Sequence, residues 1–178
     1  LALELAPERP AHCRAIQAAF RESRVVLRGI EAELVLTSLH PLEIEDLYRL
    51  KSLMAAGLSG AAALGARIGL FGLARPSAAA ISAAEDMAEM AGIIREMVPL
   101  VNRGEPLEEH QRRLDRLRDE AEKYLLVGMG ELYEGAAPDP AELLEMIKWS
   151  QIYDRLEETL SHLSEVASLL GTFARATV

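Results

Sequence analysis

One stretch near the end of the chain constrains the fold more than any other. Between Asp139 and Ala174, apolar residues recur at alternating intervals of three and four residues, which is the period of a helix with one buried stripe. The stripe comprises Met146, Trp149, Tyr153, Leu156, Leu160, Leu163, Ala167, Leu170 and Ala174. A helix of about 35 residues is roughly 50 Å long at 1.5 Å per residue. Such a helix in a chain of 178 residues predicts an elongated helical bundle.

The start of this long helix is also readable from the residues. Asp139 is a residue type that caps helices, Pro140 suits the first helical position, and Glu142 stands where the carboxylate of a capping box is expected. The helix is therefore predicted to begin at Pro140.

Four earlier helices follow from the same apolar spacing. They are predicted at about 11–36, 41–73, from 77 to a turn at 102–104, and 106–132, with Pro99 helping to end the third. The first seam is Cys13, Ile16, Phe20, Ser23, Leu27, Ile30 and Leu34. The third helix's seam is Ile81, Ala84, Ala88, Ala91, Ile94 and Val98, and the fourth's is Leu107, Leu114, Leu117, Ala121, Tyr124 and Leu132.

The connections between these helices are short, and no segment alternates at period two long enough to form a strand. Short connections favour antiparallel neighbours. We therefore expect residues 1–178 to form a single all-α domain, an elongated antiparallel helical bundle.

The stretch from Leu53 to Leu73 carries Arg67 as its only charge and contains five glycines. Its length and apolarity allow a membrane span, and Gly65 and Gly69 form a small-residue pair at the spacing used in membrane helix packing. A central, tightly packed bundle helix is the interpretation we favour, because glycines are unfavourable in helices unless neighbouring backbones come close.

The charge of the chain and the motifs that it lacks exclude several classes of function. The formal net charge of −9 argues against nucleic-acid binding, and the single cysteine, Cys13, excludes an internal disulfide. The four histidines, His12, His40, His110 and His162, lie on four different predicted elements. No Gly-rich phosphate loop, nucleophile elbow or Cys-x-x-Cys motif occurs in the sequence. The sequence therefore favours a protein that is not an enzyme and has no cofactor.

The first helix carries an arginine stripe away from its apolar seam. Arg14, Arg21, Arg24 and Arg28 recur at intervals of seven, three and four residues and so share one face. One interpretation is a solvated face whose charges are offset by acids on neighbouring helices. The other is a docking surface for an acidic partner, anionic lipid headgroups or a phosphate-like anion.

Three passages of the chain together resemble the PhoU-like phosphate transport regulators, in particular the subgroup encoded beside Pit-type phosphate permeases. The passages are His40-Pro41-Leu42-Glu43-Ile44-Glu45-Asp46-Leu47-Tyr48-Arg49-Leu50, Glu131-Leu132-Tyr133-Glu134 followed by Asp139-Pro140, and Lys148-Trp149-Ser150-Gln151-Ile152-Tyr153-Asp154-Arg155-Leu156-Glu157-Glu158 continuing to Glu165-Val166-Ala167-Ser168-Leu169-Leu170. The resemblance implies a bundle of two three-helix repeats, with Leu1 to Ala6 as the tail of an incomplete first helix.

Members of that family carry pairs of acidic residues four apart, which can share a metal ion. The resemblance projects these pairs onto Phe20 with Arg24, Ala55 with Ser59, Arg118 with Glu122, and Glu157 with Ser161. Only Glu122 and Glu157 are still acidic, so the resemblance implies a divergent member without the family's metal clusters. Arg24 and Arg118 stand where the family has acids, and they either bind an anion or pair with Glu157 and Glu122.

The function that the resemblance implies is a non-enzymatic regulatory or adaptor protein for inorganic phosphate transport. Such a protein contacts a phosphate permease or a signalling protein through its helix faces, in the cytoplasm or at the periphery of the inner membrane. The alternative is a divergent structural bundle with no remaining phosphate or metal role, which self-associates as a homodimer through its apolar faces.

Overall fold

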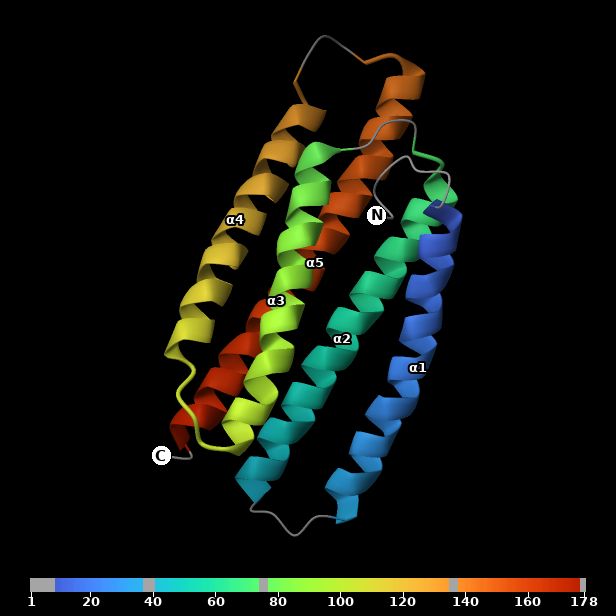
Figure 1. Ribbon diagram of the computed structural model, residues 1–178. Coiled ribbons are helices and arrows are strands. Elements are labelled where there is room, and N and C mark those ends of the chain that lie inside the picture. Colours follow the sequence, from blue (N-terminus) through green and yellow to red (C-terminus); the bar gives the residue numbers. More distant parts are fainter. Residues whose placement is uncertain (1–8, 37–40, 74–76, 135–137, 177–178) are drawn as a thin grey trace.

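The computed structural model describes residues 9–36, 41–73, 77–134 and 138–176, and these ranges form five helices and no strand. The helices are α1 (Arg9–Leu36), α2 (Pro41–Phe71), α3 (Ala78–Asn102), α4 (Glu108–Leu132) and α5 (Pro140–Ala176). They pack antiparallel, with α1 at one edge of the bundle and α4 at the other (Figure 1). The prediction of an all-α antiparallel bundle is confirmed. His40 and Leu1–Ala6 lie outside the described residues.

The helix ends follow local chemistry. The Asp139 carboxylate accepts hydrogen bonds from the backbone N–H groups of Ala141 and Glu142, both at 2.8 Å, and Glu142 accepts one from the Asp139 N–H at 3.1 Å. This is the predicted capping box. Gly72 follows α2 with a φ of 56°, a left-handed conformation that suits glycine at a helix end. By contrast, Pro99 does not end α3, which continues to Asn102.

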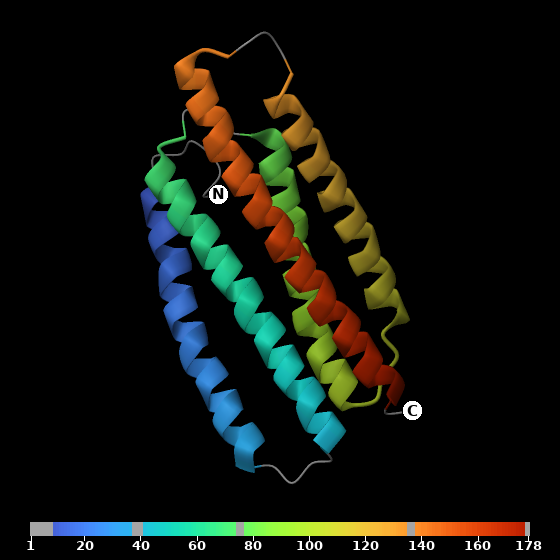
Figure 2. The same cartoon turned by 180° about the vertical axis from the view of Figure 1, so that it is seen from behind.

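The helix at the centre of the bundle is α5, and the expectation that α2 is central was wrong. Within the described residues α5 contacts α2, α3 and α4, whereas α2 contacts only α1 and α5, and α1 contacts only α2. Seen from behind, α1, α2 and α5 lie side by side (Figure 2). The glycines of α2 therefore allow close packing against two helices, α1 and α5, and α2 is not enclosed by the described helices on all sides.

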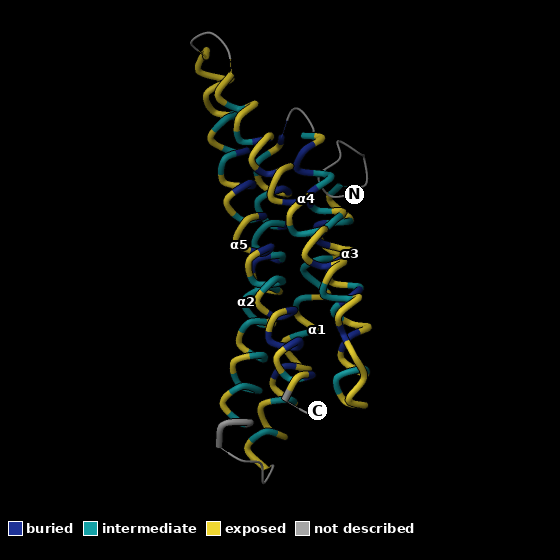
Figure 3. Tube along the Cα trace, turned by 90° about the vertical axis from the view of Figure 1, so that its left-hand side faces the viewer, coloured by how far each residue is buried: buried dark blue, intermediate teal, exposed yellow. Residues whose placement is uncertain are grey.

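The central position of α5 accounts for its burial. Trp149, Tyr153, Leu156 and Leu160 are buried as predicted, and Ile152, which the predicted stripe omits, is completely buried. A helix with neighbours on three sides buries more than one stripe. Figure 3 shows buried positions on the inward faces of the helices and exposed positions along their outward faces.

Two predicted seams need correction. The buried stripe of α3 is Ala79, Ala80, Ala83, Met87, Met90, Ile93 and Met97. On the predicted stripe Ala88 and Ala91 are exposed, and Val98 is 52% exposed. Leu107, the N-cap of α4, is buried as predicted, as are Leu114 and Ala121. Further along α4, Tyr124 is exposed and Leu125 is buried instead. Both helices offered two apolar arcs, and the positions of α4 and α5 decide which arc is covered.

Two glycines of α2 permit close approach of its neighbours. A Cβ atom at Gly60 would lie 2.6 Å from the Thr159 hydroxyl oxygen of α5, and one at Gly65 would lie 3.1 Å from the Ile16 side chain of α1. These distances are shorter than normal van der Waals contacts. The tight packing predicted for the glycine-rich helix is therefore present on its two contacted sides.

Among the described helices, α2 is the one whose span Ile44–Phe71 is long and apolar enough to cross a membrane by length and composition alone. In the structure this helix packs against α1 and α5, and most of its residues are half-buried rather than buried.

Candidate functional site

The outermost helix, α1, is held by contacts along one face only. Its Cys13 and Ile16 side chains lie against Gly69 and Gly65 of α2, and the Gln17 side-chain amide donates a 2.6 Å hydrogen bond to the Ala62 carbonyl oxygen. Only Cys13 and Leu27 of α1 are buried. Among the described residues, the exposed positions of α1 therefore have no neighbouring helix over them.

The arginine stripe lies on the part of α1 that α2 does not cover. Arg14, Arg21, Arg24 and Arg28 are all exposed. None of the four forms an ion pair within the described part of the chain, where the ion pair between α1 and α2 is Glu31 with Lys51 at 2.8 Å. The interpretation that neighbouring acids offset these charges therefore gains no support from the described residues.

Large apolar side chains are mixed with the arginines on the same face. Val25 is four residues after Arg21 and three before Arg28, so it lies between them on the helix surface, and it is 61% exposed. Val35 is two helical turns beyond Arg28 and is 71% exposed. The outer face of α1 thus combines exposed positive charge with exposed apolar area.

Beside the arginine stripe, the neighbouring face of α2 continues this surface without acidic charge. Gln17 lies on the arginine side of α1, three residues after Arg14, and its contact at Ala62 identifies the side of α2 that adjoins the stripe. Ser59 and Ala66, one helical turn before and after Ala62, share that side. From Ser52 to Phe71 the only charged residue of α2 is Arg67. We call the arginine stripe, Val25, Val35, the exposed Leu36 at the end of α1 and this side of α2 the outer face.

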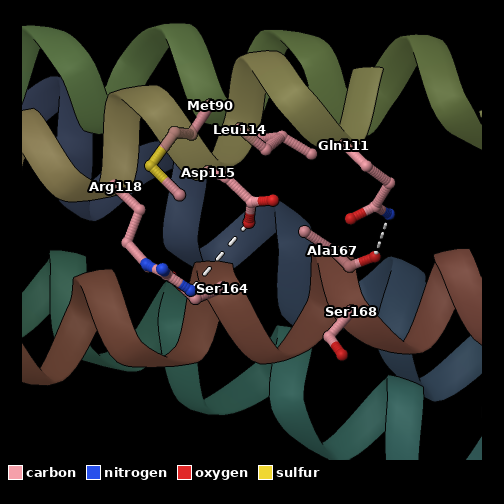
Figure 4. Close-up of a pocket in the computed structure, with 8 residues that line it drawn as sticks. All are labelled: Met90, Gln111, Leu114, Asp115, Arg118, Ser164, Ala167 and Ser168. Atoms are coloured by element: carbon pink, nitrogen blue, oxygen red, sulfur yellow. Dashed lines mark hydrogen bonds and ion pairs between the residues drawn. The ribbon is translucent and has the colours of Figure 1, made fainter. Parts of the chain in front are cut away.

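Arg118 lies in a different setting from the arginines of α1. It lines a hollow of about 130 Å³ between α3, α4 and α5 (Figure 4). Its guanidinium is 3.0 Å from Asp119, 3.6 Å from Glu122 and 3.9 Å from Asp115. These carboxylates, chiefly Asp119 through its hydrogen bond, raise the pKa of Arg118. Of the two alternatives for Arg118, the structure places it in contact with Glu122.

The rest of the hollow is lined by polar and apolar side chains from all three helices. Its lining residues are Met90, Gln111, Leu114, Asp115, Arg118, Ser164, Ala167 and Ser168. The Gln111 side-chain amide donates a 2.9 Å hydrogen bond to the Ala167 carbonyl oxygen (Figure 4). An anion near Arg118 would meet the Asp115 carboxylate, so the hollow does not favour an anionic ligand.

The residual acidic positions of the family do not come together. Glu122 is engaged with Arg118, whereas Glu157 is exposed on α5. Arg24 is on α1, which does not contact α5, so it does not approach Glu157. Across the described residues, no group of three His, Cys, Asp or Glu side chains is arranged to hold a metal ion. His12, His110 and His162 lie on three separate helices. That the protein lacks the metal clusters of the family stays a prediction.

Asp86 of α3 is a half-buried acid that the sequence analysis did not single out. One of its carboxylate oxygens is buried without a hydrogen bond. Burial, followed by the nearby charges of Glu120, Glu89 and Glu85, raises the pKa of Asp86. The available signal was spacing, because Asp86 follows Ala83 by three residues and precedes Met90 by four on the stripe that is buried.

Two comparisons bear on the identity of the chain. No model of a known protein family matches it, and no curated protein matches it either.

Proposed function

We propose that this protein is a non-enzymatic regulatory or adaptor protein linked to inorganic phosphate transport, and that it docks on a permease or signalling partner through the outer face. The phosphate part of the proposal rests on the resemblance of the three sequence passages. The docking part rests on the structure of α1.

The observation that carries the docking proposal is the combination of position and charge at α1. This edge helix has one neighbour, α2, among the described helices, and the four arginines of its stripe are exposed without an ion pair there. α1 has five arginines and three acids, Glu22, Glu31 and Glu33, whereas the whole chain has 19 basic and 28 acidic residues. Unpaired charge concentrated on one face gives orientation and specificity to an encounter with a partner of opposite charge.

Co-purification with the phosphate permease from membranes tests the proposal. The stripe variant changes the four arginines to glutamate. A matched control changes four exposed basic residues on α3 and α4, namely Arg95, Arg112, Arg116 and Lys123, to glutamate. The native protein and the control are expected to co-purify with the permease, and the stripe variant is not. Absence of the permease from the native preparation, or equal recovery with all three proteins, contradicts the proposal.

A second candidate, a self-associating bundle without a phosphate role, is favoured by a separate observation. Val26 of α1 is 62% exposed, and Met54 and Leu58 of α2 are 37% and 36% exposed. A contiguous exposed apolar patch marks an interaction site, and a dimer interface across α1 and α2 would bury these three side chains. Sedimentation equilibrium of the native protein and of a variant with serine at these three positions distinguishes the candidates. A homodimer that the substitutions dissociate supports self-association, and a monomer at all concentrations excludes it.

A further inference from the structure

We infer that the outer face binds the anionic headgroups of a lipid bilayer. This inference rests on the proposed function, because it names the chemistry that holds the adaptor beside a membrane transporter. It can nevertheless fail or succeed independently, because lipid binding needs no transporter.

The arrangement of the arginines favours an extended anionic surface over a small anion. Arg14 and Arg28 are fourteen residues apart on one helix, which places them about 21 Å apart along its axis. Side chains spread along a straight helix do not converge on one phosphate group, but a plane of headgroups meets all of them at once. Anionic bilayers attract basic segments that lie close to their surface.

The apolar residues on the same face favour a lipid surface, in which the permease of the proposed function also lies, over a soluble acidic protein. Val25 and Val35 are 61% and 71% exposed, and Leu36 at the end of α1 is 79% exposed. Helices that lie in a membrane interface combine arginines or lysines with apolar side chains that enter the boundary between headgroups and acyl chains. An acidic protein surface would pair the arginines and leave these three side chains without an apolar partner.

The overall negative charge of the protein does not oppose this orientation. The outer face continues onto the side of α2 that adjoins the stripe, and α2 has no acid from Ser52 onward. The acidic residues Glu85, Glu89, Asp115 and Glu120 belong to α3 and α4, which do not contact α1. When the outer face is turned toward a bilayer, α5, α3 and α4 lie farther from the headgroups than α1 does. Salt therefore screens the repulsion between their acids and the headgroups more strongly than it screens the attraction of the arginines on α1.

Sedimentation with lipid vesicles tests the inference directly. The native protein is mixed at low salt with vesicles of phosphatidylcholine alone or of phosphatidylcholine with 30% phosphatidylglycerol, a composition that sets the negative surface potential. It is expected to bind the anionic vesicles, to bind the neutral ones at least about tenfold more weakly, and to be released as salt screens the headgroups. Equal binding to both vesicles, or no binding to anionic vesicles at low salt, overturns the inference.

Three variants identify the face that binds. Changing the four arginines of the stripe to glutamine is expected to lower the partition onto anionic vesicles by at least about a hundredfold. Changing Arg95, Arg112, Arg116 and Lys123 to glutamine alters the net charge equally and is expected to leave the partition within about threefold of native. Equal losses in these two variants overturn the inference. Changing Val25, Val35 and Leu36 to serine is expected to lower the partition about tenfold or more.

A competition experiment separates the lipid from an acidic protein. A soluble polyglutamate peptide is added at the same concentration of negative charge as the vesicles. Retention of the protein on the vesicles supports the inference. Complete release, together with unchanged vesicle binding by the serine variant, shows a surface for acidic protein and overturns the lipid assignment. Because these vesicles contain no permease, a failure here leaves the permease co-purification result standing, and the reverse also holds.

Discussion

Replacing Gly128 of α4 by alanine is expected to destabilise the protein, although alanine favours helices more than glycine does. A Cβ atom at Gly128 would lie 2.0 Å from the hydroxyl oxygen and 2.3 Å from the Cζ atom of Tyr153 on α5. The Tyr153 side chain cannot easily move, because it is only 2% exposed and its hydroxyl shares a 2.5 Å hydrogen bond with Ser77, the N-cap of α3.

The magnitude follows from three contributions. Overpacking of a buried contact costs about 1 to 3 kcal/mol, and loss of the Tyr153–Ser77 hydrogen bond costs about 1 kcal/mol. Alanine in place of glycine in a helix returns about 1 kcal/mol. The net destabilisation of Gly128→Ala is therefore about 1 to 3 kcal/mol, which corresponds to a fall in Tm of roughly 2 to 12 °C in a protein of this size.

Urea denaturation of the native protein and two variants measures this effect. Gly130→Ala is the matched control, because it is on the same helix and a Cβ atom there would have no neighbour within 4 Å. The control is expected to be unchanged or slightly stabilised, by up to about 1 kcal/mol. If Gly128→Ala is stabilised to the same degree as Gly130→Ala, the close packing of α4 against Tyr153 is wrong.

Three further predictions concern packing, pH and metal content. Gly65→Leu is expected to destabilise the protein by about 1 to 3 kcal/mol through overpacking against Ile16; denaturant unfolding that shows no loss would contradict the contact. Because the pKa of folded Asp86 is raised above its unfolded value, Asp86 opposes folding at neutral pH, and this penalty is relieved as the pH falls through the folded pKa. Asp86→Asn should therefore raise the Tm at pH 7. The Tm of this variant should also rise less on mild acidification than the Tm of the native protein. A Tm at pH 7 lower than that of the native protein would contradict a destabilising role for Asp86. Elemental analysis is expected to find fewer than two transition-metal ions per chain, since only Glu122 and Glu157 keep acidic side chains at the projected positions; two or more would refute this.

Local signals in the sequence predicted the elements well, because each depends on residues a few positions apart. The capping box of Asp139 and Glu142 and the apolar stripe around Trp149 and Leu156 are of this kind. Which apolar arc of a helix is covered depends instead on distant helices. Alanine-rich α3 offered two arcs, and only the contact with α4 and α5 selects the one containing Met90 and Met97.

The candidate site likewise has features that local spacing predicts and features that depend on tertiary contacts. Helical spacing placed Arg14, Arg21, Arg24 and Arg28 on one exposed face of α1, as the structure has them. The spacing could not reveal whether acids on other helices pair with them, because that depends on tertiary contacts. Arg118 illustrates the difference: its partners Asp115, Asp119 and Glu122 lie within four residues on the same helix.

Phosphate uptake by cells lacking this protein tests the central claim most directly, because it joins the phosphate role to the outer face. The cells are supplied with the native protein, with the variant that has glutamate at the four stripe positions, or with the matched control at Arg95, Arg112, Arg116 and Lys123. Removal is expected to change the uptake rate, and the native and control proteins are expected to restore it while the stripe variant does not. Uptake that is unchanged by removal, or restored fully by the stripe variant, would contradict the account.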